Sequence, residues 1–172
     1  MGVPMKGLTE PHVLLASSNL NKLIRNLAGI IAVDELRKIQ IAIDVEVVAL
    51  FSLGMSHYNF ALGLDKSHWR QRVSRMYYAA YNIKRSVQLN ENGTYSTDSG
   101  DHQKIDQLPD SFANAATYRA KLKNMRDDRN LADYSHLGDE GDLLIKPDDM
   151  QKVVTDFMND AKSYLIARGV IL

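Results

Sequence analysis

The sequence predicts an all-α fold: an antiparallel bundle of four long helices, with short helices in the connections and an extra N-terminal helix. Three observations support this prediction. Apolar residues recur at helical spacing along most of the 172 residues. The one segment that alternates like a strand has no second strand to pair with. Only 4 prolines and 10 glycines interrupt the chain, which argues against a loop-rich fold.

The composition is that of one globular domain. A chain of 172 residues with 45% hydrophobic side chains is long and apolar enough to bury one core. The 21 Lys and Arg residues balance the 21 Asp and Glu residues, which excludes an evenly basic nucleic-acid-binding coat and an acidic tail. The chain has no cysteine, so disulfides, thiol catalysis and cysteine metal sites are excluded. This composition fits a cytoplasmic protein.

Residues 1–43 are expected to form an N-terminal extension with one amphipathic helix. The helix should span residues 18–33, with Ser18 or Asn19 as its cap. Its apolar stripe consists of Leu20, Leu23, Ile24, Leu27 and Ile31. The first residues lack the apolar core of a signal peptide.

Residues 39–47 are ambiguous, because they are rich in β-branched side chains and alternate as in a strand. The residues that follow carry a helical stripe instead, and we therefore predict a helix over residues 44–62. The apolar run from Val47 to Met55 is too short to span a bilayer. The bundle itself is expected to cover residues 44–168.

Residues 67–89 are predicted to be the clearest helix. Its apolar stripe consists of Trp69, Val73, Met76, Tyr77, Ala80, Ile83 and Val87. Arg70, Arg72, Arg75 and Arg85 are placed on the opposite, solvent-facing side. The segment 65–92 has six positive and two negative residues, a net charge of +4. This charge predicts either a polyanion-binding surface or a solvated helix face.

The second half is expected to contain two more long helices. Pro147 and the acidic residues after it suit a first helical turn, and Gly169 suits a helix end. The predicted elements are a loop over 90–102, a short helix over 103–108 stopped by Pro109, a helix over 111–134, a loop over 135–146 and a helix from Pro147 to Gly169.

Arg129 stands at an unusual position. It continues the apolar stripe formed by Tyr118, Leu122 and Met125, so its guanidinium should be turned away from water. A buried, unpaired guanidinium costs several kcal/mol. Arg129 should therefore form a structural ion pair with a neighbouring aspartate, bind an anion or lie in an interface.

The histidines offer one candidate catalytic group. No two of them are spaced for a metal site within one helix, so no metal and no cofactor are expected. We expect ordinary structural or surface roles, without catalysis or ligand binding, for His12, His57, His68 and His102. His136 follows Arg129 by seven residues, and this pair is suited to cleaving RNA without a metal. Arginine would hold the phosphate, and histidine would take the 2′-hydroxyl proton or protonate the leaving 5′-oxygen.

Two motifs resemble those of HEPN domains. Residues 74–81, SRMYYAAY, look like the family's S-R-x-Y-Y-A-x-[YF] signature. Residues 126–134, RDDRNLADY, resemble the R-x-x-A-D-Y end of the fourth helix in one branch. The motifs come in the family's order, and the resemblance covers about residues 44–168.

The resemblance implies a compact helical bundle that dimerises through its motif helices. Active HEPN proteins are metal-independent endoribonucleases of toxin–antitoxin, CRISPR and abortive-infection systems, and each protomer gives one Arg-His pair to a composite cleft. By resemblance Arg129 and His136 would be catalytic, with Asn130 orienting one of them. Backbone contacts with RNA would come from Arg70, Arg72, Arg75, Arg85 and Arg126.

The sequence also departs from the family pattern. Tyr134 stands where the commoner motif has its histidine, which makes Tyr134 a candidate site or modification residue. Gly138 stands where the branch silenced by a nucleotidyltransferase has a tyrosine. Two other hypotheses therefore remain. One is a non-catalytic HEPN module that dimerises and binds a partner, such as a nucleotidyltransferase. The other is an adaptor bundle whose N-terminal helix docks elsewhere.

Overall fold

The computed structural model describes residues 19–96 and 99–172. Within these ranges the secondary structure consists of helices joined by loops, and there is no strand. The prediction of an all-α helical bundle is therefore confirmed, whereas the HEPN-like arrangement stays a prediction. The helices are α2 (Leu20–Leu27), α3 (Val33–Leu62), α4 (Trp69–Asn92), η1 (Ser99–Lys104), α5 (Ala115–Tyr134), η2 (Glu140–Asp142) and α6 (Pro147–Ile166).

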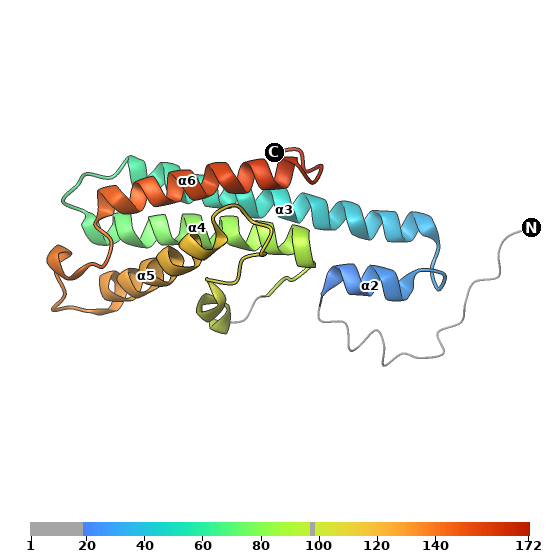
Figure 1. Cartoon of the computed structure of the whole chain (residues 1–172), viewed down its shortest axis with the longest axis horizontal. Helices are drawn as coiled ribbons and strands as arrows, with labels where there is room; N and C mark the ends of the chain where they lie inside the picture. The colour runs from blue at the N-terminus through green and yellow to red at the C-terminus, as the bar shows by residue number, and fades with distance from the viewer. Residues whose placement is uncertain (1–18, 97–98) are drawn as a thin grey trace, which may run out of the picture.

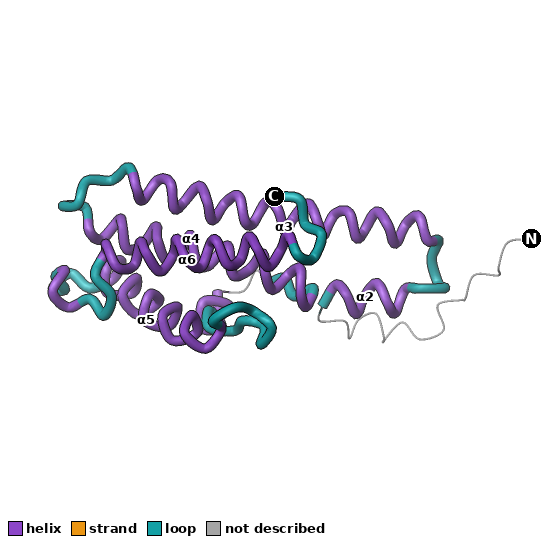
Figure 2. The backbone as a smooth tube through the Cα atoms, turned by 45° about the horizontal axis from the view of Figure 1, so that its top comes forward, coloured by secondary structure: helices purple, strands orange, loops and turns teal. Residues whose placement is uncertain are grey.

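The four long helices α3 to α6 lie side by side and alternate in direction (Figure 1). The second view shows the same alternation, with α2 folded back beside the start of α3 (Figure 2). Helix α4 is central, because α3, α5 and α6 all pack against it. The C-terminal end of α5 carries the second motif, residues 126–134, and packs against α4. The second motif therefore lies next to the first motif, residues 74–81.

The core follows the predicted stripe of α4. Val73, Met76, Tyr77, Ile83 and Val87 are all buried, and Trp69 packs at the edge of the core. Helices α3 and α4 approach closely at Gly54, where a Cβ would lie 2.6 Å from Cγ1 of Ile83 and 2.9 Å from the Ala79 carbonyl oxygen. A side chain at position 54 would therefore push these two helices apart.

Helix α3 begins earlier than the sequence predicts. It spans 30 residues from Val33, so residues 39–47 are helical, and the expected boundary between residues 43 and 44 falls inside one continuous helix. Its first turns, before Ile43, have no buried side chain, so the core imposes no helical stripe on them. Among the described residues α3 alone is long and apolar enough to cross a membrane, a test that a core helix also passes. From Ile43 onward α3 is such a core helix, with Val47, Leu50 and Phe51 buried in the bundle.

Helix α2 is tied to the end of α4. Asn19 caps α2 by accepting a hydrogen bond from the Lys22 backbone N–H at 2.6 Å, whereas Ser18 lies outside the described residues. The backbone N–H of Leu20 donates to the carbonyl of Gly93 at 2.8 Å. Gly93 has φ +62°, and a Cβ there would lie 2.5 Å from the Asn21 nitrogen. Glycine therefore permits both the turn after α4 and this contact.

The end of α5 is fixed by the buried Asp128 and the half-buried Arg70. Asp128 accepts the backbone N–H groups of Leu144 at 2.7 Å and Ile145 at 2.9 Å, which anchors the connection to α6. Arg70 donates to the carbonyls of Ala132 and Ser135, both at 2.8 Å, and also to that of Gly138. These bonds satisfy carbonyls that a helix C-terminus leaves unpaired.

The connection between α4 and α5 also differs from the prediction. The expected short helix over 103–108 is replaced by the 3₁₀ helix η1 at Ser99–Lys104. Beyond it, Ile105, Leu108 and Phe112 are buried in the core. These three anchors hold the connection against the bundle and fix the position of η1 beside α5.

Candidate functional site

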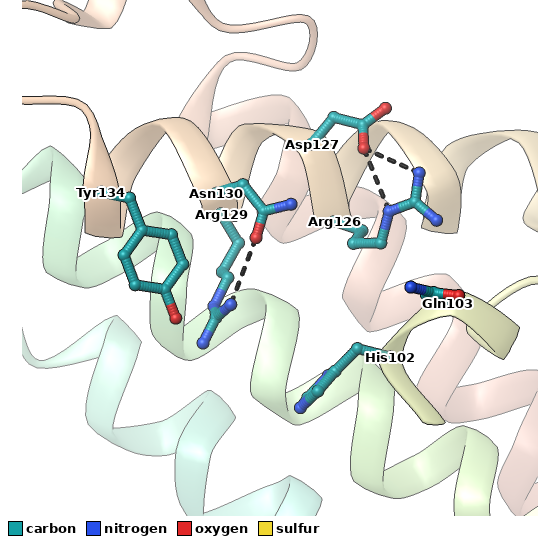
Figure 3. Close-up of a pocket in the computed structure, with 7 residues that line it drawn as sticks. All are labelled: His102, Gln103, Arg126, Asp127, Arg129, Asn130 and Tyr134. Carbon is teal, nitrogen blue, oxygen red and sulfur yellow. Dashed lines mark hydrogen bonds and ion pairs between the residues drawn. The ribbon is translucent and has the colours of Figure 1, made fainter. Parts of the chain in front are cut away.

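A pocket of about 740 Å³ lies between α5 and η1. Its lining is mostly polar and consists of His102, Gln103, Arg126, Asp127, Arg129, Asn130 and Tyr134. Figure 3 shows His102 reaching in from η1, while Arg129 and Tyr134 project from α5 toward α4. The pocket thus joins the second motif with a segment that the sequence analysis left without a function.

Arg129 is largely buried beneath this pocket, with 13% of its side chain exposed. Its Nη2 donates to the hydroxyl of Tyr78, and its Nη1 donates to Oδ1 of Asn130 at 3.2 Å. Its Nε lies 2.7 Å from Oδ2 of Asp133, an ion-pair distance, but without hydrogen-bond geometry. Arg129 is therefore turned away from solvent as predicted, and it pairs with a neighbouring aspartate, Asp133.

Aromatic rings of α4 and α5 surround the guanidinium. Its central carbon lies 5.2 Å from the ring centre of Tyr78, 5.8 Å from that of Tyr77 and 5.1 Å from that of Tyr134. These distances allow cation–π attraction, which holds the charge in place without using its N–H donors. An arginine has five such donors, and the bonds to Tyr78 and Asn130 use two of them. Of the other three, the Nε–H is buried beside Asp133, so one N–H on each of Nη1 and Nη2 remains for an anion in the pocket.

His102 contacts the same tyrosines of α4. Its Nδ1 is 2.7 Å from the hydroxyl of Tyr77, and its ring stacks on Tyr81 with centres 4.3 Å apart. Burial, followed by the positive charge of Arg129, lowers the pKa of His102 below its usual value of 6.5. The imidazole is therefore mainly neutral near pH 7 and can accept a proton.

Two tyrosines beneath the pocket, Tyr77 and Tyr81, remain protonated. Burial raises the pKa of the Tyr77 hydroxyl well above its usual range. Burial and the hydrogen bond to Asp101 raise the pKa of Tyr81 to about 12. Tyr81 donates to Oδ2 of Asp101 at 3.0 Å, which ties η1 to α4 one residue before His102.

The other predicted site residues are distributed differently. Arg126 and Asn130 line the pocket, and Arg126 is held by Asp127 at 2.9 Å. His136 is exposed in the loop after α5 and is not among the lining residues. Tyr134 lines the pocket and is 71% exposed.

The arginines of α4 do not form one solvent-facing row. Arg72 is buried, which contradicts its predicted exposure, because it points at the first turn of α6 and pairs with Asp148 at 3.0 Å. Arg70 is used at the end of α5, as described above. Arg75 contacts His57 at 3.3 Å, and Arg85 donates to the Ser96 carbonyl at 2.9 Å. A continuous RNA-binding track along α4 is therefore not formed by these four residues.

The candidate group that sequence reasoning missed is His102. It lies in a segment without periodicity, and its place in the fold depends on buried residues further along the connection. Tyr77, Tyr78 and Tyr81 belong to the first motif, but no feature of the sequence indicates that residue 102 lies next to them. His102 lies beside the second motif in space, and His136 follows the motif's last residue by two positions in the sequence. His12 is outside the described residues.

No metal cluster accompanies this site: in residues 19–96 and 99–172 no group of three or more His, Asp or Glu side chains is placed to hold a metal ion. Comparisons with protein-family models, with curated proteins and with solved structures find no match to this chain.

Proposed function

We propose that this protein is a metal-independent endoribonuclease that binds an RNA phosphate in the pocket between α5 and η1. One observation carries the proposal: a largely buried guanidinium, Arg129, faces a polar pocket that also holds a neutral imidazole. Arginine can grip a phosphate with two N–H groups and stabilise the charge that grows on it during cleavage. RNA supplies its own nucleophile in the 2′-hydroxyl, so the protein needs only a charge and a proton acceptor.

The motifs at residues 74–81 and 126–134 extend this proposal to a biological role. Their resemblance to HEPN domains supports a cytoplasmic toxin or phage-defence effector with a nucleotidyltransferase or another antitoxin as its partner. Two contacts support a joint role for the motifs, since Arg129 of the second bonds Tyr78 of the first and Asp133 lies 3.4 Å from the Ser74 hydroxyl. The two motifs then form one site.

The proposal is tested by incubating the purified protein with total RNA in the presence of EDTA. We expect cleavage to persist, with products that end in a 2′,3′-cyclic phosphate and a 5′-hydroxyl. Single-stranded DNA should bind without being cut, because it lacks the 2′-hydroxyl. Absence of cleavage of any RNA, with intact helical structure by circular dichroism, would contradict the proposal.

The second candidate is a non-catalytic module that dimerises and binds a partner protein. The ion pair between Arg129 and Asp133 at 2.7 Å favours it, because this pair offers the guanidinium a structural role. Its cleft would still accept an anion. An RNA-cleavage assay separates the two candidates, since only the first produces cyclic phosphates.

Both candidates include a two-fold dimer built on α4 and α5. Large apolar side chains are exposed at the end of α5, with Tyr134 at 71% and Leu137 at 84%. We expect analytical ultracentrifugation at tens of micromolar to give the mass of a dimer, and Leu137→Asp to shift the protein toward the monomer. A wild-type protein that sediments as a monomer under these conditions would count against the dimer.

A further inference from the structure

The pocket contains a histidine that the motif resemblance does not assign. His102 belongs to η1, and it enters the pocket from the side opposite α5 (Figure 3). Its neighbour Asp101 is buried and accepts the Tyr81 hydroxyl, while Ile105 is buried in the core. The backbone on both sides of His102 is therefore anchored, which gives the imidazole a defined position.

Arg129 and His102 share the same two tyrosines. Tyr77 binds Nδ1 of His102 through its hydroxyl and lies 5.8 Å from the central carbon of Arg129. Tyr78 accepts a hydrogen bond from Arg129, and its ring meets the His102 ring edge-on with centres 6.0 Å apart. Arg129 and His102 thus pack against the same two tyrosines of α4, and both side chains line the pocket above them.

The hydrogen bond to Tyr77 distinguishes the two ring nitrogens of His102. Nδ1 is engaged at 2.7 Å from the tyrosine oxygen. Either the Tyr77 hydroxyl or Nδ1 can be the donor in this bond, and we assign the hydrogen to Nδ1, which leaves the lone pair of the neutral ring on Nε2. Nε2 is then the atom that can take a proton from a bound molecule.

We propose that His102 is the general base of this site and that Tyr77 is its positioning residue. This inference rests on the proposed function. Nε2 of His102 removes the proton of the ribose 2′-hydroxyl, and the 2′-oxygen forms a bond to phosphorus. The P–O5′ bond breaks, the leaving 5′-oxygen takes a proton from water, and the imidazolium later returns its proton to solvent. Arg129 stabilises the negative charge on the phosphate during this exchange.

The charged and titratable groups around His102 favour its neutral form. Burial and Arg129 both lower the pKa of His102, and Asp101 opposes them. The groups that face or influence the ring are Tyr77, Tyr78, Tyr81, Lys84 and Arg85 of α4, Arg129 of α5 and Asp101 of η1. The base is active when deprotonated, so kcat/KM should fall as the pH drops through the pKa of His102, below 6.5.

The first experiment compares His102→Ala with the wild type on a short single-stranded RNA in EDTA. We expect kcat to fall by about 10²–10⁴-fold, the usual contribution of a general base. The affinity for the matching 2′-deoxy oligonucleotide should stay within about threefold, because Arg129 still binds the phosphate. His68→Ala, an exposed histidine at the other end of α4, is the matched control. His102→Asn keeps a polar group near Tyr77 and replaces His102→Ala if that variant does not fold.

The second experiment tests the positioning role of Tyr77. Tyr77→Phe keeps the ring and removes only the hydroxyl that binds Nδ1. We expect kcat to fall while KM is retained, and the acidic limb of the pH profile to shift. A purely structural role would lower the melting temperature without moving this limb.

The outcomes separate the two proposals. RNA cleavage by the wild type together with unchanged kcat in a folded His102→Ala or His102→Asn variant would overturn this inference and leave the proposed function standing. Loss of cleavage in His136→Ala, with His102→Ala still active, would assign the base to His136 and also overturn it. A wild type that cleaves no RNA overturns the proposed function and this inference together.

Discussion

Arg129→Lys is expected to lower RNA cleavage by about 10²–10³-fold, the scale of losing one preorganised donor to a developing negative charge. Lysine keeps the positive charge but cannot reproduce the planar, two-point grip on a phosphate. It also cannot bond Tyr78 and Asn130 at once in the way that the guanidinium does. The measurement is single-turnover cleavage of a defined RNA in EDTA, with oligonucleotide affinity measured in parallel.

Arg119→Lys is the matched control for this change. Arg119 lies on the same helix, and it contacts Asp110 and the carbonyl of Leu108 rather than the pocket. We expect Arg119→Lys to cleave RNA at the wild-type rate. If Arg129→Lys is equally active and remains folded, then Arg129 has only the structural role that its ion pair with Asp133 offers.

The long helices could be predicted because the bundle imposes a stripe on each of them. Helix α4 shows this best, since Val73, Tyr77 and Val87 are all fully buried. The start of α3 could not be predicted in the same way. Within residues 39–47, Ile43 and Val47 are buried one helical turn apart, while Ile41 and Val45 are exposed. The strand-like alternation of apolar residues therefore masks this short helical stripe.

Charged residues on α4 show a second limit of periodicity. At about 100° per residue, Arg72 lies at the edge of the apolar stripe beside Ile83, and it is not solvent-facing because α6 begins there and brings Asp148 to 3.0 Å. Arg70 likewise donates hydrogen bonds to the carbonyls at the end of α5 rather than facing solvent. Spacing along one helix predicts which side faces its own core, and it does not predict which neighbouring helix end covers the other side.

The candidate site could be predicted only on its α5 side. Arg129 could be recognised because it interrupts an apolar stripe, and Asn130 and Tyr134 follow from the same helix. The opposite side depends on the connection between α4 and α5, which has no repeat. Ile105, Leu108 and Phe112 anchor that connection, and only three-dimensional packing shows that His102 then lies beside Tyr77.

Tyr77→Ala is expected to lower the free energy of unfolding by about 3–5 kcal/mol, as for other large-to-small core changes. Tyr77 is fully buried, its ring packs against Tyr78 and Tyr81, and its hydroxyl binds His102. For a domain of this size the melting temperature should fall by about 6–20 °C. Urea denaturation followed by far-ultraviolet circular dichroism measures the change.

Two further variants show which part of Tyr77 is responsible. Tyr77→Phe keeps the buried ring and loses one hydrogen bond, so it should cost only about 1 kcal/mol. Tyr95→Ala removes a tyrosine that is 45% exposed and contacts Arg85, and it should cost less than about 1 kcal/mol. Because ring burial dominates the stabilisation, Tyr77→Ala should be the most destabilised of the three. Equal stabilities of Tyr77→Ala and Tyr95→Ala would mean that the tyrosines beneath Arg129 and His102 are not part of the core. The proposed site would then lack the rigidly packed side chains that hold Arg129 and His102 in position.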